Sequence, residues 1–179
     1  SKVRRLLSAV VTAAALVIAV TTCGGDKSVR PNPTPAALTR IAGDGQSGTV
    51  GQARPISLSV KVVDAAGAPV SGVSVAWSVT VGGGSVAPAT STTDAAGLAS
   101  TIWTLGAVAG SNTASAAVQR STSIPPVSFG ATSLAGPPAK LVFAVAPVAV
   151  TAGSAISPAM QVAVQDALGN VVSDAPVAV

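Results

Sequence analysis

The chain has 179 residues, enough for one or two domains, and 49% of them are hydrophobic although only 2% are aromatic. It has no histidine and no glutamate, and Cys23 is its only cysteine, so it lacks most of the side chains that serve acid–base catalysis, zinc binding and disulfide formation. The net charge of +4 comes largely from three basic residues in the first five positions, and the scatter of the others argues against nucleic-acid binding. We therefore expect no enzyme, no cofactor, no metal site and no nucleic-acid partner.

The N-terminus is typical of an export signal. Lys2, Arg4 and Arg5 precede an uncharged, mostly apolar stretch over residues 6–20. As a helix this stretch would be about 22 Å long, which is shorter than the ~30 Å hydrocarbon core of a bilayer. Residues 1–22 are therefore predicted to form the helix of a secretory signal peptide rather than a stable membrane span.

The only cysteine stands directly after this stretch, in Val20-Thr-Thr-Cys23-Gly-Gly-Asp26. The segment resembles the lipobox of bacterial lipoproteins, in which the cysteine is diacylated and becomes the first residue of the mature chain; Thr22 departs from the usual Gly, Ala or Ser. The resemblance implies lipidation of Cys23, which would hold an exported protein at the outer membrane or cell surface. An ordinary signal peptide followed by an incidental cysteine is the alternative.

A proline-rich segment follows the cysteine. Pro31, Pro33 and Pro35 alternate with polar residues, a composition that favours an extended polyproline spacer. We interpret residues 23–35 as the anchor cysteine and its tether.

The rest of the chain contains an internal repeat. Leu58-Ser-Val-Lys-Val-Val-Asp64-Ala-Ala-Gly67 is matched 102 positions later by Met160-Gln-Val-Ala-Val-Gln-Asp166-Ala-Leu-Gly169. Further upstream, Pro35-Ala-Ala-Leu38 is matched 103 positions later by Pro138-Ala-Lys-Leu141. A unit of about 100 residues has the size of an immunoglobulin-like domain.

Alternating apolar residues predict the strands of the first copy. Four sets are expected to face a common core: Leu58, Val60 and Val62; Val73, Val75, Trp77, Val79 and Val81; Ala99, Thr101, Trp103 and Leu105; Ala114, Ala116 and Val118. A closing strand over residues 127–132 adds Phe129. Trp77, Trp103 and Phe129 are interpreted as core, and the fold class as an all-β sandwich.

Several motifs, in this order, resemble the group 1 bacterial immunoglobulin-like domain of the invasin and intimin type. They are Gly43-Asp-Gly45, Val62-Val-Asp64 with Gly67, Val73-Ser-Val-Ala-Trp77, Thr93-Asp94 with Gly97, and Trp103-Thr-Leu-Gly106. The resemblance covers residues 36–133, and members of that family form rod-like stalks on bacterial surfaces. It implies one complete domain over residues 36–135.

The second copy, residues 138–179, carries only the first half of the repeat and ends inside the counterpart of the strand at residues 73–81. We expect a fragment of a longer protein. In the second copy five apolar residues would then lack the sheet that should cover them: Leu141, Phe143, Met160, Val162 and Val164.

These features predict a non-catalytic stalk or adhesion protein of tandem immunoglobulin-like domains, with the membrane and other cell-surface proteins or glycans as partners. The alternative is an accessory module of a larger secreted enzyme, such as a carbohydrate-active one, whose catalytic domain lies beyond residue 179. A weaker third hypothesis is carbohydrate or calcium binding by the loops of the sandwich. Asp44 and Asp94 are lone carboxylates in glycine-rich loops, whereas calcium usually takes six to eight oxygen ligands.

Overall fold

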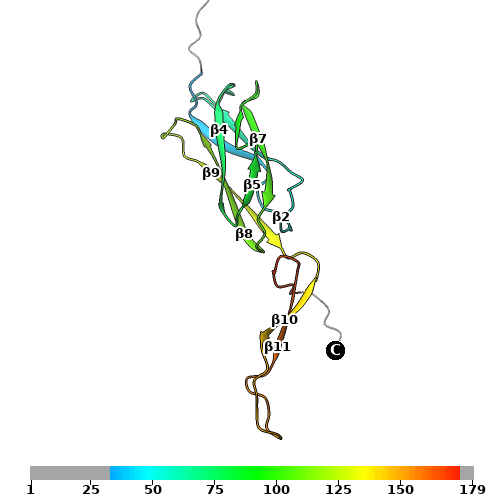
Figure 1. The fold of residues 1–179 in the computed structure, drawn as a ribbon. Coiled ribbons are helices and arrows are strands. Elements are labelled where there is room, and N and C mark those ends of the chain that lie inside the picture. Colours follow the sequence, from blue (N-terminus) through cyan, green and yellow to red (C-terminus); the bar gives the residue numbers. More distant parts are fainter. Residues whose placement is uncertain (1–32, 174–179) are drawn as a thin grey trace, which may run out of the picture. The chain divides into compact units, whose positions relative to one another are not determined.

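The computed structural model describes residues 33–173, which fold as strands and connecting loops (Figure 1). Within this range no helix is long and apolar enough to cross a membrane. The expected signal helix over residues 1–22 and the predicted lipidation site Cys23 lie outside the described residues. The predicted all-β class is confirmed for the described chain.

Nine strands form two sheets that face each other, an immunoglobulin-like sandwich. The first sheet has the order β1 (Ala37–Ala42), β3 (Leu58–Val63), β7 (Leu98–Leu105), β5 (Gly84–Ala87). The second has the order β2 (Gln46–Thr49), β9 (Val127–Leu134), β8 (Gly110–Val118), β4 (Ser74–Val81), β6 (Thr90–Thr92). All pairs are antiparallel except β2 and β9, which run parallel.

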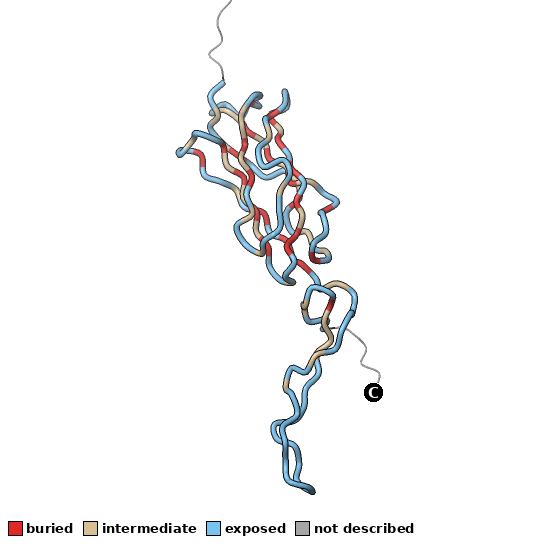
Figure 2. Tube along the Cα trace, in the orientation of Figure 1, coloured by how far each residue is buried: buried red, intermediate tan, exposed pale blue. Residues whose placement is uncertain are grey.

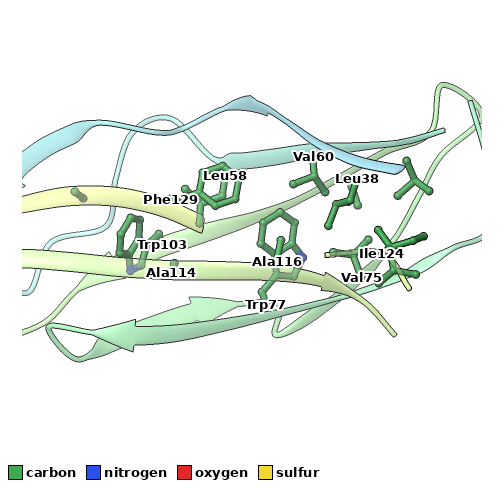
Figure 3. Close-up of a cluster of buried hydrophobic side chains, with 14 of the residues drawn as sticks. Leu38, Leu58, Val60, Val75, Trp77, Trp103, Ala114, Ala116, Ile124 and Phe129 are labelled. Carbon is green, nitrogen blue, oxygen red and sulfur yellow. The ribbon is translucent and has the colours of Figure 1, made fainter. Parts of the chain in front are cut away.

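The core lies between the two sheets and follows the alternation of the sequence, because successive side chains of a strand point to opposite faces. In β3, β7 and β8 every second residue is buried. Figure 2 shows these buried positions along the strands, and Figure 3 shows their side chains meeting between the layers. The prediction for these three strands is confirmed.

Three aromatic rings fill the space that small alanine and valine side chains leave. Trp103 and Phe129 are fully buried and Trp77 is 4% exposed. The Trp77 and Phe129 rings are tilted, with centroids 6.0 Å apart, a separation at which aromatic pairs attract. The Trp77 indole also donates a hydrogen bond to Ser91 Oγ at 2.8 Å. All three aromatic residues are core, as predicted.

The apolar face predicted for β4 is shorter than expected. Val75 and Trp77 are buried, whereas Val81 is 51% exposed and Val73 precedes the strand. The pairing with β8 shifts between Val79 and Val81, since Val79 pairs with Ala114 and Val81 with Thr113. Such a bulge adds one residue and turns the following side chain to the other face. The prediction for Val81 is therefore wrong.

A third, two-stranded sheet consists of β10 (Lys140–Val145) and β11 (Gln161–Gln165). Its apolar residues are exposed: Leu141 68%, Phe143 60%, Met160 51% and Val162 56%, while Val164 is half-buried. The counterparts of Met160, Val162 and Val164 in the first copy, which are Leu58, Val60 and Val62, are fully buried. The difference arises because the second sheet of the sandwich covers β3, and no described strand does the same for β11.

Truncating Trp77 should cost the sandwich about 3–5 kcal/mol of unfolding free energy, because a large buried side chain leaves a cavity. The matched control is Ile102→Ala on the outer face of β7, which removes a side chain that is 51% exposed; its cost should stay near ~0.5 kcal/mol. Urea denaturation followed by circular dichroism measures both. Equal losses for the two variants would contradict the assignment of Trp77 to the core.

Candidate functional site

The carboxylates of the described aspartates accept hydrogen bonds from backbone N–H groups. In Asp64-Ala-Ala-Gly67 and Asp94-Ala-Ala-Gly97, the Oδ1 atom accepts the N–H groups two and four residues later at 2.8–2.9 Å. The glycine closes each turn at a φ of +81° or +74°, a conformation that suits glycine. Asp166-Ala-Leu-Gly169 repeats the arrangement, with bonds at 2.9 and 2.8 Å and a glycine φ of +93°.

Asp44, the other carboxylate considered for calcium, is also engaged. Its Oδ1 accepts the Gly130 N–H at 2.8 Å, and its Oδ2 forms an ion pair with Arg40. Arg40 in turn donates to the Ser128 carbonyl at 2.8 Å. The pair thus connects the end of β1 with β9. Within residues 33–173, no three metal-ligating side chains gather. Asp44 and Asp94 belong to separate loops; the Asp44 carboxylate bonds to β1 and β9, and the Asp94 carboxylate bonds to its own turn.

Arg54 is a buried residue that the sequence did not single out. It is 8% exposed, and its guanidinium donates to the Ser47 carbonyl at 2.8 Å and to the Gln52 carbonyl at 3.2 Å. Gly48 makes room for it, because a Cβ there would lie 1.4 Å from Arg54 Nη1. Gly48 lies in the short polar strand β2, which carries no periodic signal in the sequence. Arg54 holds the loop after β2 against the sandwich.

A network of hydrogen bonds joins the turn after β11 to the connector between β9 and β10. We call residues 166–170, which form this turn, the junction turn. Asp166 is 1% exposed, and its Oδ2 accepts hydrogen bonds from the Gly136 N–H at 2.8 Å and from Asn170 Nδ2 at 2.9 Å. The Asn170 amide continues to the loop between β7 and β8, donating to the Ala107 carbonyl at 2.9 Å and accepting the Ala109 N–H at 2.8 Å.

These bonds set the charge state of Asp166. Burial raises the pKa of its carboxyl, but hydrogen bonds from the Asn170 side chain and from the backbone of Gly136, Asn170 and Leu168 outweigh burial and lower it from 3.8 to about 2. Asp166 is therefore an anion across the neutral and mildly acidic range. The sequence analysis did not single out Asp166 as a buried anion. The available signal was that Asn170 stands where the first copy has Ala68.

Comparison with known families accounts for the sandwich. Residues 46–130 match the bacterial Ig-like domain (group 1). The chain contains a group 1 bacterial Ig-like domain. The matched stretch includes β2 to β8 and part of β9, and β1 completes the first sheet of this Ig-like domain by pairing with β3.

The chain is also similar to several solved structures, three of which follow. FdeC, an Escherichia coli adhesin, matches with a TM-score of 0.48 and 18% identity over 80% of this chain and 44% of that one. The D00–D0 domain of intimin matches with a TM-score of 0.40 and 20% identity, over 53% of this chain and 46% of that one. InvD of Yersinia pseudotuberculosis matches with a TM-score of 0.44 and 12% identity, over 76% of this chain and 42% of that one. This chain spans less than half the length of each. A comparison with curated protein sequences finds no match.

If the Asp94 carboxylate stabilises its own turn, replacing Asp94 should lower the stability of the domain even when no calcium is present. Asp94→Ala removes the acceptor of two N–H groups and should cost the Ig-like domain about 1 kcal/mol. Asp94→Asn keeps an oxygen at the same place and should cost less. Thermal denaturation with and without calcium compares the variants. A melting temperature of the unaltered chain that rises with calcium would contradict this assignment.

Protonation of Asp166 should loosen the junction turn only in strong acid. Because its pKa is lowered from 3.8 to about 2, its stabilisation is complete above 3.8 and is lost as the pH falls through about 2. The Gly136 amide resonance, followed by NMR between neutral pH and pH ~1.5, reports the titration. Asp166→Asn should abolish the inflection. A midpoint at or above the ordinary value would show that these hydrogen bonds do not form.

Proposed function

We propose that the chain is a non-catalytic surface spacer: tandem bacterial Ig-like repeats carried on a lipid attached to Cys23 and holding a more distal part of the protein away from a bacterial membrane. The observation that carries this proposal is the repetition of strand pairing. In the first copy Ala37 pairs with Val63 and Leu38 with Val62. In the second Lys140 pairs with Gln165 and Leu141 with Val164.

The repetition extends to the irregularities of the pairing. The register shifts between Arg40 and Ala42 in β1, and between Phe143 and Val145 in β10, at the same distance from the start of each strand. The backbone bonds beside these strands also recur: Val70 N–H to the Val62 carbonyl at 3.0 Å becomes Val172 N–H to the Val164 carbonyl at 2.9 Å. A bulge is a specific feature, so its recurrence supports a second Ig-like repeat directly after the first.

The connection between the copies supports a spacer more than loosely joined domains. The connector includes Pro137 and Pro138, whose φ is restricted. Its Gly136 N–H is held by Asp166 at 2.8 Å, and Ala139 N–H is bonded to the Gln165 carbonyl at 2.8 Å. A short connector with both flanks hydrogen-bonded limits rotation, which a spacer requires.

The N-terminal sequence supplies the proposed attachment. The apolar stretch over residues 6–20 would direct export, Cys23 would carry the lipid, and the proline-rich residues up to 35 would separate the first Ig-like domain from the membrane. The proposed site of action is the outer membrane or cell surface, with surface proteins or glycans as the class of adhesion partner.

Replacing Cys23 tests the attachment. Expressed with its N-terminal segment in a Gram-negative host, the unaltered chain should fractionate with membranes and incorporate radiolabelled palmitate. Cys23→Ser should lose the label and be released or remain unprocessed. Thr22→Ala, which restores the usual residue before the cysteine, is the control and should be labelled at least as well. An unaltered chain recovered in the cytosol with its leader intact would contradict the proposal.

A further inference from the structure

Asn170 uses its whole side-chain amide to bind the backbone of the sandwich that precedes it. One N–H of Nδ2 meets the Ala107 carbonyl at 2.9 Å, and Oδ1 accepts the Ala109 N–H at 2.8 Å. Residues 106–109 form the loop between β7 and β8. The two bonds run in opposite directions between the same two segments, so they fix both the position and the orientation of the amide.

Asp166 prepares the Asn170 amide for this contact. Its Oδ2 accepts the remaining N–H of Asn170 Nδ2 at 2.9 Å, and its Oδ1 accepts the Asn170 backbone N–H at 2.8 Å. Since the carboxylate can only accept, the nitrogen of the amide must face it and the oxygen must face Ala109. A buried anion with four hydrogen bonds, two of them from one residue, holds that residue in a single orientation.

The first repeat has the same aspartate turn but no asparagine held by the carboxylate. Asp64 accepts two N–H groups in the same way, at 2.9 Å each, but the residue in the place of Asn170 is Ala68. The counterpart of Gly136, 103 positions earlier, is Pro33, which has no N–H to donate. Asp64 is also less buried than Asp166. The turn therefore forms without a side-chain amide at this position, and Asn170 is not required for the turn of its own repeat.

We propose that Asn170 is the residue through which a repeat docks onto the preceding Ig-like sandwich, with Asp166 as its positioning residue. The partner surface is the loop between β7 and β8, read through its backbone carbonyl and N–H groups. Because backbone groups do not depend on the side chains of that loop, one asparagine can serve successive repeats of different sequence. This inference deepens the proposed spacer function and rests on it, since it explains how the repeats are kept in a fixed relation.

Amide hydrogen exchange on the full chain in detergent micelles tests the contact residue by residue. Asn170→Ala should speed exchange of the Ala109 amide about tenfold or more, because its acceptor is lost. The Leu168 amide, bonded to Asp166 Oδ1 at 2.9 Å within the turn, should keep its rate, which separates lost docking from local unfolding. Ala68→Asn, the equivalent position of the first repeat, is the matched control and should leave Ala109 unchanged.

NMR relaxation on the same samples measures whether the repeats move together. The amides of β7 and β11 should share one rotational correlation time in the unaltered chain, and β11 should gain independent motion in Asn170→Ala. Unchanged Ala109 exchange and unchanged relaxation in that variant would overturn the assignment of Asn170 while leaving the spacer intact. Independent motion already present in the unaltered chain would overturn the assignment too. Failure of the spacer function itself shows separately, in the fractionation of the Cys23 variants.

Discussion

Three turns of the described chain are built on an aspartate carboxylate that accepts two backbone N–H groups. The same Oδ1 geometry appears at Asp64, Asp94 and Asp166. Each turn lies where a strand must end cleanly so that its apolar alternation does not run into the loop. A glycine with positive φ three residues later completes the reversal. Without the side-chain acceptor these turns would leave those N–H groups to water.

Between these turns, noncovalent packing of the facing side chains joins the two sheets. The only cysteine of the chain is Cys23, so no intramolecular disulfide joins the sheets. Alanines on β8, with Ala114 and Ala116 fully buried, let the sheets approach closely, and the large rings of Trp103 and Phe129 fill the remaining width. Alternating small and large residues in facing layers allows dense packing without voids. The low aromatic content therefore concentrates stability in a few positions.

Periodicity predicted the strands that are half-buried and regular, because an inward and outward alternation leaves a signal of period two in the sequence. It could not predict β2, β5 and β6, which are short and rich in Gly, Ser and Thr. It also missed the bulge before Val81, since an inserted residue changes the face without changing the composition. The burial of Arg54 depends on the space above Gly48, and that space exists only once β2 pairs with β9. Long-range pairing of this kind is not encoded in any short stretch.

The comparison of the two copies separates what a repeat needs in order to fold from what it needs in order to be joined to its neighbour. Strand pairing, the bulge and the aspartate turn occur in both, so they belong to the repeat. The apolar face of Leu58 and Val60 is covered only in the first, where burial contributes about 1.5–3 kcal/mol for each large side chain. In the second, the equivalent face is open, and the described polar contacts gather at the junction turn instead. The turn that begins at Asp166 sends hydrogen bonds to the preceding sandwich, through Asn170 to the loop between β7 and β8. The buried carboxylate orients the amide that contacts the preceding sandwich, and this is a physical reason for the charge to lie at the junction rather than inside a sandwich.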